Sequence, residues 1–333
     1  MVLNIDDDHR DSYANMEDMT KTFYQFIMGS IAVLNADDKH AKTLFNKATV
    51  TFGIKNSATY TAKNIERVKG RYSFSLYVHG RKRGRITLSV LGRHNVYNAL
   101  AAIAVADLFN VDFEVIKNAL SAFKGVKRRG ELLGEFERLK VYADYAHHPQ
   151  ELAATLSAFQ ESGVKPIVVF QPHTYSRTQA LLNDFIGVLS KQKRVIIYKT
   201  YPAREKYKKL GSAKTLFSQL ARQALLNQEV EVIYADNPKT LRSAIKLYID
   251  NINKQNTTDK SQKTNGQSAN HFRRKTKRQP INHLDAKPNC QFTSQSADSE
   301  DAILVLGAGD IYQIAKGALG LNKKQKMARN KAD

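Results

Sequence analysis

The first part of the chain mixes helical and strand-like patterns of apolar positions. Short apolar runs predict buried strands, alternation between residues 48 and 91 predicts a β-rich stretch, and three segments have helical periodicity. The expected strands lie at 2–5, 31–34, 72–78 and 85–90 and the expected helices at about 16–28, 94–108 and 112–123, with a hairpin turn at 79–84. We assign residues 1–126 to one domain.

The rest of the chain, residues 127–333, alternates between apolar runs and helical patterns. The boundary lies in a basic, glycine-flanked connector at 125–130. Strands are expected near 139–144, 165–170, 193–198, 230–235 and 302–306, and helices near 149–160, 177–190, 214–226, 237–250 and 309–319. This alternation predicts an α/β fold whose parallel sheet is covered by helices on both faces.

One segment, 251–300, interrupts the alternation. It is rich in Asn, Gln, Ser, Thr and Lys and has hardly any periodic apolar pattern, which predicts a disordered insertion before the last strand. The basic run at 273–278 inside it can bind nucleic acid or an anionic surface, but a solvated loop with a charge run is the favoured interpretation.

Composition indicates a globular protein with two domains. Hydrophobic residues make up 42% and aromatic residues 9% of the 333 positions, as in ordinary globular chains. No run approaches the ~18 apolar residues that span a bilayer, the start lacks the regions of a signal peptide, and the single cysteine, Cys290, excludes an internal disulfide. We therefore expect a cytoplasmic protein without membrane insertion.

The net charge of +21 favours acidic partners. Lysines and arginines are scattered along the whole chain, however, and no helix-turn-helix, zinc-finger or aromatic RNA-binding pattern is visible. Surface charge together with a phosphate-rich ligand is the favoured interpretation, and dedicated nucleic-acid binding is not expected.

Two polar segments that directly follow predicted strands carry the candidate chemistry. Residues 144–149 are Asp-Tyr-Ala-His-His-Pro, and residues 170–178 are Phe-Gln-Pro-His-Thr-Tyr-Ser-Arg-Thr. Open α/β sheets bind ligands at the carboxyl ends of their strands, so we expect both segments on one rim. There Asp144 can accept hydrogen bonds from a ribose or orient a basic group, and Arg177, at a helix start, can bind a carboxylate through two hydrogen bonds.

Other positions have both a functional and a structural interpretation. His9, in an acidic loop after a buried strand, can ligate a divalent cation or belong to an ordinary surface loop. Asn95 and Asn98 share one face of a first helical turn, where they suit a phosphate or purine, or where Asn95 merely caps the helix. Arg129, on the connector, can reach phosphates when the domains close or be one more exposed cation. The Gly-Ala-Gly turn at 307–309 predicts close backbone approach to a ligand or a neighbouring loop.

Together these segments resemble the Mur ligases. The matching pieces occur in the family's order and cover nearly everything except 251–300. They are Asn4-Ile5…Asp8-His9…Asp11, Gly92…His94-Asn95…Asn98-Ala99-Leu100-Ala101-Ala102, Gly125-Val126…Arg128-Arg129, Asp144-Tyr145-Ala146-His147-His148-Pro149, Phe170-Gln171-Pro172-His173…Arg177-Thr178 and Leu306-Gly307-Ala308-Gly309-Asp310-Ile311. The two rim segments are similar to the alanine-adding branch, with the murein-peptide ligase of the recycling branch as the nearest competitor.

The resemblance implies a fold: the carboxyl-terminal part of a P-loop-type central ATPase domain, followed by a Rossmann-like parallel-sheet domain. It also implies ATP-dependent ligation of L-alanine to UDP-N-acetylmuramate through an acyl phosphate, with Mg²⁺, in peptidoglycan precursor synthesis. By position it implies His9 as a catalytic metal ligand, Arg129 as a catalytic hinge residue, Asn95, Asn98, Arg129 and Asp144 as nucleotide-binding residues, and Tyr145, His147, His173 and Arg177 as the L-alanine site.

The sequence also departs from the family pattern. Ala143 and Gly130 stand where an acidic and an aromatic residue are usual, but neither change removes a reacting group. Neither the domain that binds the UDP sugar nor a glycine-rich loop with Lys and Ser or Thr, which cradles ATP phosphates, occurs in the sequence. We therefore expect a chain that starts partway through the central domain and does not ligate unless a separate amino-terminal half completes it. The rival interpretation is a non-catalytic binding or scaffold remnant that uses the basic insertion.

Overall fold

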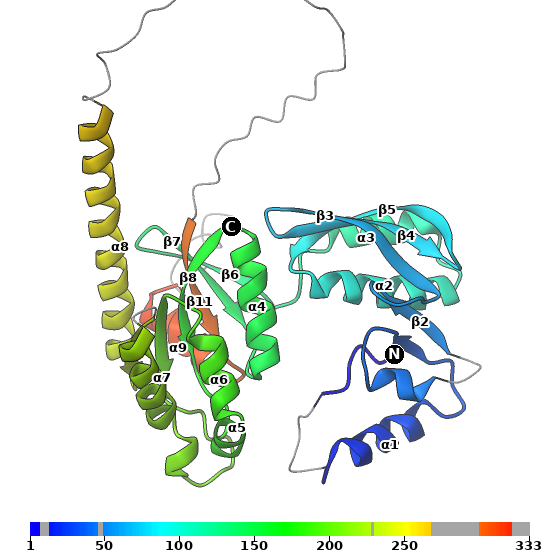
Figure 1. The fold of residues 1–333 in the computed structure, drawn as a ribbon, viewed down its shortest axis with the longest axis horizontal. Coiled ribbons are helices and arrows are strands. Elements are labelled where there is room, and N and C mark those ends of the chain that lie inside the picture. The colour runs from blue at the N-terminus through cyan, green and yellow to red at the C-terminus, as the bar shows by residue number, and fades with distance from the viewer. Residues whose placement is uncertain (7–12, 46–48, 228–229, 268–299, 322–333) are drawn as a thin grey trace, which may run out of the picture.

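The computed structural model describes residues 1–6, 13–45, 49–227, 230–267 and 300–321, for 227 and 257–267 without their side chains. The described chain forms two α/β units, each built around its own sheet (Figure 1). The expected boundary at 126/127 falls between the last helix of the first unit and the first strand of the second. Within these residues no helix is both long and apolar enough to cross a membrane.

The first unit is a five-stranded sheet with helices on both faces. Its elements are α1 (Met16–Ile27), β1 (Val33–Asn35), the 3-10 helix η1 (Ala41–Leu44), β2 (Val50–Gly53), β3 (Tyr60–Val68), β4 (Arg71–Val78), β5 (Arg81–Leu91), α2 (His94–Leu108) and α3 (Phe113–Ala122). In the order β1-β2-β3-β4-β5, the first three strands run parallel and the last three are antiparallel. Successive residues of β1 point to opposite faces of the sheet. Val33 therefore packs in the core between the sheet and α2, and Leu34 packs in the core on the other face, with α1.

Two details of the first unit differ from the expectation. In the described residues 1–6, Val2 and Ile5 are buried, but the segment forms a single bridge between Val2 and Leu34 instead of a strand. The hairpin turn consists of His79 and Gly80, both with positive φ (47° and 77°), so β5 already begins at the next residue. A two-residue turn of this kind matches the twist of paired strands, which extends the pairing into the basic segment.

The second unit is a doubly wound sheet of six strands. Its elements are β6 (Glu131–Phe136), β7 (Leu139–Asp144), α4 (Pro149–Glu161), β8 (Val164–Phe170), α5 (Tyr175–Ala180), α6 (Leu182–Leu189), β9 (Arg194–Tyr198), η2 (Lys209–Gly211), α7 (Ala213–Asn227), β10 (Glu231–Ala235), α8 (Pro238–Gln267), β11 (Glu300–Leu306) and α9 (Ile311–Ala318). The strand order is β10-β9-β8-β11-β7-β6. The predicted parallel sheet is confirmed for five strands, and β6, antiparallel to β7, is an additional edge strand.

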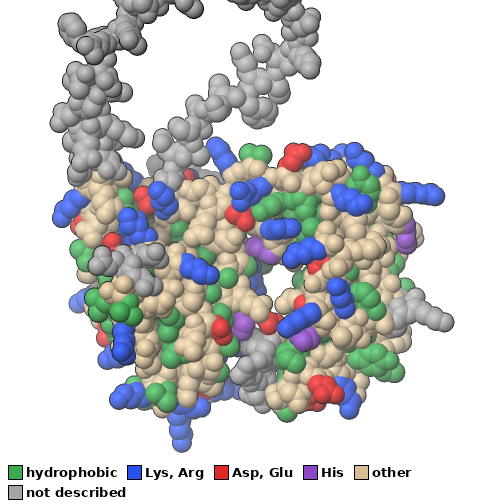
Figure 2. Space-filling model, in the orientation of Figure 1, with side chains coloured by type: hydrophobic (Ala, Val, Ile, Leu, Met, Phe, Trp, Pro, Cys, Tyr) green, Lys and Arg blue, Asp and Glu red, His purple; other side chains and the backbone are tan. Residues whose placement is uncertain are grey.

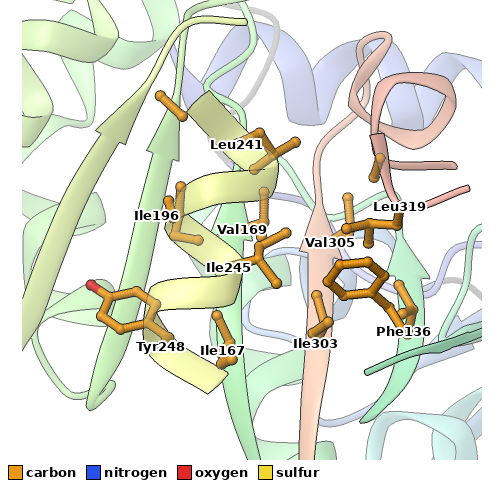
Figure 3. Packing of buried hydrophobic residues seen from close by; sticks show 14 of the residues in the cluster. Phe136, Ile167, Val169, Ile196, Leu241, Ile245, Tyr248, Ile303, Val305 and Leu319 are labelled. Carbon is orange, nitrogen blue, oxygen red and sulfur yellow. The ribbon is translucent and has the colours of Figure 1, made fainter. Parts of the chain in front are cut away.

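Helices cover both faces of this sheet, as the alternating pattern predicts. On one face, Leu241 and Ile245 of α8 pack over the central strands beside residues of α9 (Figure 3). On the other face α4, α6 and α7 contribute Leu156, Phe185 and Leu216 to a second core. Because the central strands are buried on both sides, they consist of continuous apolar runs in the sequence.

The expected disorder from residue 251 onward is wrong for 251–267, because α8 continues to Gln267. The first half of α8 is anchored in the core by Tyr248, Ile249 and Ile252. Once packing has formed the first turns of a helix, each further residue adds one backbone hydrogen bond and fixes the backbone of only one residue. A helix can therefore continue into polar sequence. Residues 268–299, which include the basic run at 273–278, lie outside the described residues.

Helix α4 of the second unit contacts the first unit at both of its ends. Near its start, Gln150 Nε2 donates to Asp6 Oδ1 (2.9 Å). At its end, the hydroxyl of Tyr72 on β4 donates to Glu161 Oε2 (2.7 Å). On the face shown in Figure 2, the two units enclose a hollow with basic, acidic and histidine side chains around it.

Candidate active site

The loops after β7 and β8 form one rim, as the sequence predicts. The ring centres of Tyr145 and His147 are 5.3 Å apart, and those of His147 and His173 are 5.6 Å apart. Arg177 Nη1 lies 3.2 Å from His173 Nδ1. The two strands are not neighbours, however, because β11 lies between them. The helix after β11 packs on one face and the helices after β7 and β8 on the other, which opens the crevice where such sheets bind ligands.

Asp144, the last residue of β7, is held by backbone N–H groups. The residue is only 8% exposed; Oδ2 accepts from Gly130 N (2.8 Å) and Oδ1 accepts from Ala146 N (2.9 Å). Burial raises the pKa of its carboxyl, against the opposing effects of these two N–H groups and of the Arg129 charge. The carboxylate therefore fixes the connector to the end of β7, and a ribose hydroxyl would share its oxygens with the backbone.

The connector carries two arginines, of which the sequence singled out Arg129. That guanidinium is centred 5.5 Å from the Tyr145 ring centre and lies 3.8 Å from Glu151 Oε1. Arg128 is held more tightly: it donates to two carbonyls of the turn after β11 (3.0 and 3.1 Å), and its guanidinium is 4.6 Å from the Tyr145 ring centre. Arg128 therefore attaches the connector to the sheet, while Arg129 lies nearer to solvent.

Helix α4 begins with a reciprocal cap that also orients the rim. His148 is the N-cap, Pro149 follows, and the Glu151 carboxylate accepts from His147 N (3.1 Å) and His148 N (3.4 Å). His147 Nδ1 lies 3.2 Å from the same carboxylate and 3.0 Å from the carbonyl oxygen of Tyr145. Glu151 was not predicted from the sequence. A Glu three residues after an N-cap residue is a known signal, but His is not among the usual N-cap residues.

A third loop, after β9, completes the rim and was also missed. The ring of Tyr201 stacks on His173, with 5.4 Å between centres and 17° between planes. Glu205 caps the start of α5, where its Oε2 accepts from Tyr175 N and Ser176 N, both at 2.8 Å. The rule that identified the first two loops applies here too, since Tyr201 follows the carboxyl end of a parallel strand.

The Gly-Ala-Gly turn after β11 lies against the loop after β8. A Cβ on Gly309 would lie 2.5 Å from Gln171 Oε1 and 2.6 Å from Tyr201 Cγ, so no larger residue fits there. Gln171 in turn donates to Asp310 Oδ1 (2.8 Å) and accepts from Ile311 N (3.1 Å). Of the two interpretations of the glycines, close approach to a neighbouring loop is the one that the structure confirms.

Asn95 and Asn98 lie in the first turn of α2, on the other unit. Asn98 Nδ2 donates to Asn95 Oδ1 (2.9 Å), and Asn95 Nδ2 donates to the carbonyl of Leu91 (2.7 Å). The N-cap residue is Arg93, which makes no side-chain cap bond, so capping by Asn95 is not what the structure shows. The two amides form a pair at the helix start, and Asn95 Nδ2 also lies 3.1 Å from Nε2 of His94.

His9 lies outside the described residues, so its metal-ligand role stays a prediction. Among the side chains that the structure describes, no three His, Cys, Asp or Glu residues gather at metal-binding distances. Asp6 precedes His9 by three positions in the sequence. In space it lies next to the start of α4, where its Oδ2 is 3.9 Å from His148 Nδ1. The segment that leads to His9 therefore starts at the contact between the two units.

The rim combines a guanidinium, imidazoles and a phenol at one edge of the sheet. A guanidinium binds a carboxylate through two parallel hydrogen bonds, and imidazole nitrogens and hydroxyls can accept hydrogen bonds from an ammonium group. The arrangement thus suits a small molecule that carries both a carboxylate and an amine, next to a connector whose arginines suit phosphate or ribose oxygens.

Two α/β units joined by an arginine-bearing connector, with this rim on the second unit, agree with the fold that the resemblance to the Mur ligases implies. The family model described as "Mur ligase middle domain" matches residues 1–106, and the model described as "Mur ligase, glutamate ligase domain" matches residues 128–258. The chain belongs to the Mur ligase family.

Similar curated proteins are named UDP-N-acetylmuramate–L-alanine ligase. The one from Caldanaerobacter subterraneus subsp. tengcongensis is 33% identical over 333 residues, which cover 97% of this chain and 61% of the relative. The one from Aquifex aeolicus is 41% identical over 215 residues, covering 62% of this chain and 47% of the relative. This chain thus spans between 47% and 61% of the length of these two relatives.

Solved structures confirm the fold. The UDP-N-acetylmuramate-alanine ligase MurC of Thermotoga maritima matches with a TM-score of 0.64 at 21% identity, over 97% of this chain and 59% of that chain. A murein peptide ligase of Psychrobacter arcticus matches with a TM-score of 0.54 at 19% identity, over 96% of this chain and 56% of that chain. Both matches extend over the two units of this chain, in agreement with the predicted fold.

Proposed function

We propose that this chain carries the amino-acid and nucleotide-ribose parts of an ATP-dependent ligase that joins L-alanine to UDP-N-acetylmuramate. The observation that carries the proposal is the rim of Tyr145, His147, His173 and Arg177, whose rings are in contact and whose guanidinium lies 3.2 Å from an imidazole. The names of the curated relatives support this substrate pair over the murein peptides of the recycling branch.

In this proposal L-alanine binds at the rim. Arg177 pairs with its carboxylate, and His173, stacked on Tyr201, keeps the guanidinium in place. His147 and Tyr145 border the amine, which must lose its proton before it can attack. In this arrangement the amine of L-alanine would face the hollow between the two units.

The nucleotide would lie on the facing side of the same hollow. Asp144 accepts a ribose hydroxyl, the amide pair of Asn95 and Asn98 contacts the nucleotide, and Arg129 reaches its phosphates from the connector. Mg²⁺, with His9 as one proposed ligand, would neutralise charge on the transferring phosphoryl group.

The reaction proceeds in two steps. A carboxylate oxygen of the muramoyl group attacks the γ-phosphorus of ATP, the bond to the β–γ bridging oxygen breaks, and ADP leaves. The alanine amine then attacks the acyl carbon, gives up a proton, and phosphate leaves with the former carboxylate oxygen. The sequence contains no Gly-Lys-Ser or Gly-Lys-Thr loop to hold the ATP phosphates, so we expect turnover to need a segment that supplies one.

The test is a ligation assay on the chain alone and on the chain supplied with an amino-terminal Mur ligase segment that has a phosphate loop. We expect UDP-N-acetylmuramoyl-L-alanine and phosphate to appear in the supplied sample only. In that sample Arg177→Ala should lower kcat/KM for L-alanine about 100-fold, the equivalent of about 3 kcal/mol for a charge-assisted pair. Arg222→Ala, on the exposed surface of α7, is the matched control and should change nothing.

Other outcomes would contradict the proposal. Phosphate release that does not depend on L-alanine, or a preference for a murein tripeptide over L-alanine, would assign the rim to a different substrate. Absence of turnover in the supplied sample, together with salt-sensitive binding of the chain to unrelated DNA, would favour the scaffold interpretation.

A further inference from the structure

Glu151 contacts both the amino-acid rim and the connector. Its Oε2 accepts from the backbone N–H of His147 (3.1 Å) and lies 3.2 Å from His147 Nδ1. Its Oε1 lies 3.8 Å from Arg129 Nη1. One carboxylate thus faces a rim imidazole with one oxygen and the connector guanidinium with the other.

The surroundings of His147 Nδ1 determine which ring nitrogen carries the hydrogen. Nδ1 lies 3.0 Å from the carbonyl oxygen of Tyr145 and 3.2 Å from the Glu151 carboxylate, and both of these groups are acceptors. A ring nitrogen between two acceptors has to donate, so Nδ1 is protonated and Nε2 of the neutral ring is an acceptor. Glu151 therefore favours the tautomer whose Nε2 can accept a hydrogen bond or a proton from an amine.

The ion pair between Glu151 and Arg129 is too open to contribute much to stability. The two side chains are 35% and 54% exposed, and exposed pairs contribute about 0–1 kcal/mol. A weak pair is readily broken when another anion competes for the guanidinium. The position of Glu151 can therefore respond to what the connector binds, without unfolding of α4.

We propose that Glu151 is a positioning residue which transmits the position of Arg129 to the imidazole of His147. When a nucleotide draws the guanidinium away, the carboxylate keeps its backbone N–H donors, loses the charge of Arg129, and holds the Nδ1–H tautomer of His147 more firmly. The functional meaning of this relay rests on the proposed ligase function. The relay itself depends only on contacts within the chain.

A second route from the connector to His147 exists and has to be separated experimentally. The Arg129 guanidinium is centred 5.5 Å from the Tyr145 ring centre, and the Tyr145 ring meets the His147 ring edge to face at 5.3 Å. Movement of Arg129 can therefore also reach the imidazole through Tyr145. Only the route through the carboxylate disappears when Glu151 is replaced.

The test is a double-mutant comparison by NMR on the full chain without ligands. The ring nitrogens of the histidines are labelled with ¹⁵N, and the His147 signals are identified by their loss in His147→Gln. We expect Arg129→Ala to shift the His147 ring signals in the wild-type chain. In Glu151→Gln, whose side-chain oxygen still accepts from His147 but which has no charge for Arg129, the same replacement should produce a much smaller shift, limited to what the route through Tyr145 transmits. Glu151→Ala alone should move Nδ1 and Nε2 toward a mixture of tautomers.

Controls keep the outcome independent of folding and of catalysis. Glu137→Gln changes the carboxylate of the turn between β6 and β7, which pairs with Lys246, and should leave the His147 signals in place. An unchanged signal of His79, on the distant hairpin, and an unchanged circular dichroism spectrum verify that each variant is folded.

The proposal is overturned if Arg129→Ala leaves His147 unaffected, or if it shifts His147 equally with and without Glu151. A failed ligation assay with a positive NMR result would contradict the proposed function and leave the relay standing.

Discussion

At the scale of single residues, two aspartates near strand ends show how surroundings set the pKa of a carboxyl group. Burial alone would raise the pKa of Asp37, but the backbone N–H groups of Ile54, Lys55 and Asn56 hold it below its usual value. At Asp144 burial prevails and the pKa is raised. The first carboxylate therefore stabilises the fold when ionised, whereas ionisation of the second opposes folding.

Replacing each aspartate should reveal opposite dependences on pH. Asp37→Asn should lower the free energy of unfolding of the first unit by about 2 kcal/mol at neutral pH, because the hydrogen bonds lose their charge. Wild type should lose this advantage as pH falls through the native pKa, below 3.8. Relative to Asp144→Asn, wild type should instead lose stability as pH rises from 3.8 through the raised native pKa. Urea unfolding of the three proteins between pH 3 and pH 7 measures both slopes, and equal slopes would contradict the account.

The sequence predicted the side chains of the rim better than the residues that hold them. Tyr145, His147 and Arg177 were predicted on one rim because each follows a parallel strand, and strand ends meet at one edge of a sheet. Glu151 and Arg128 were missed because their importance comes from hydrogen bonds to groups brought together only by folding. In the sequence, a charged residue that holds other residues in place looks the same as a charged residue that only faces solvent, because neither has a periodic pattern.

At the scale of elements, strands and helices with strong apolar periodicity were predicted closely, and polar or bulged segments were not. The helix expected at 94–108 is α2, and the strand expected at 139–144 is β7. Strand β6 was missed because its pairing shifts register next to Gly134, which breaks the alternation. The end of α8 was missed because its polar second half continues a helix that packing starts.

The contact between η2 and α5 should be sensitive to a single methyl group. A Cβ on Gly211 would lie 1.9 Å from the carbonyl oxygen of Tyr175, which is backbone and cannot turn away, whereas a Cβ on Gly187 in α6 meets nothing within 4 Å. Gly211→Ala should therefore destabilise the second unit by about 1–3 kcal/mol and speed amide exchange in α5. Gly187→Ala should stabilise the protein by about 0.5–1 kcal/mol. Thermal unfolding compares the pair, and a neutral Gly211→Ala would refute the packing described.

At the scale of the whole molecule, the sequence predicted two domains and a connector but not how the units meet. The contacts at the two ends of α4 join residues 144 and 89 positions apart, and no local pattern marks them. Burial, reinforced by the bond to Glu161, raises the pKa of the Tyr72 hydroxyl, so the phenol remains a donor at neutral pH. Helix α4 therefore directly follows the rim residues Tyr145 and His147 at its start and is hydrogen-bonded to the first unit at its end.

Loss of the hydrogen bond between Tyr72 and Glu161 should make the connector more mobile without unfolding either unit. Tyr72→Phe removes the donor of the 2.7 Å hydrogen bond and Glu161→Ala removes its acceptor, so the double variant should behave like Glu161→Ala alone. Trypsin cleavage after the exposed Lys124 and Lys127 should become faster in all three. Tyr24→Phe, on the exposed side of α1, is the matched control. Additive acceleration in the double variant would show that the two groups act independently.

We propose that this chain provides the amino-acid side of a ligase that works through an acyl phosphate. This proposal can be tested with UDP-N-acetylmuramate labelled with ¹⁸O in its carboxylate, using the chain supplied with a phosphate-loop segment. We expect one ¹⁸O in each phosphate released, formation of the alanyl product in equal amount, and, at low L-alanine, about 100-fold slower formation of both in Arg177→Ala. Phosphate that carries no ¹⁸O, or labelled phosphate released equally well without L-alanine, would contradict it.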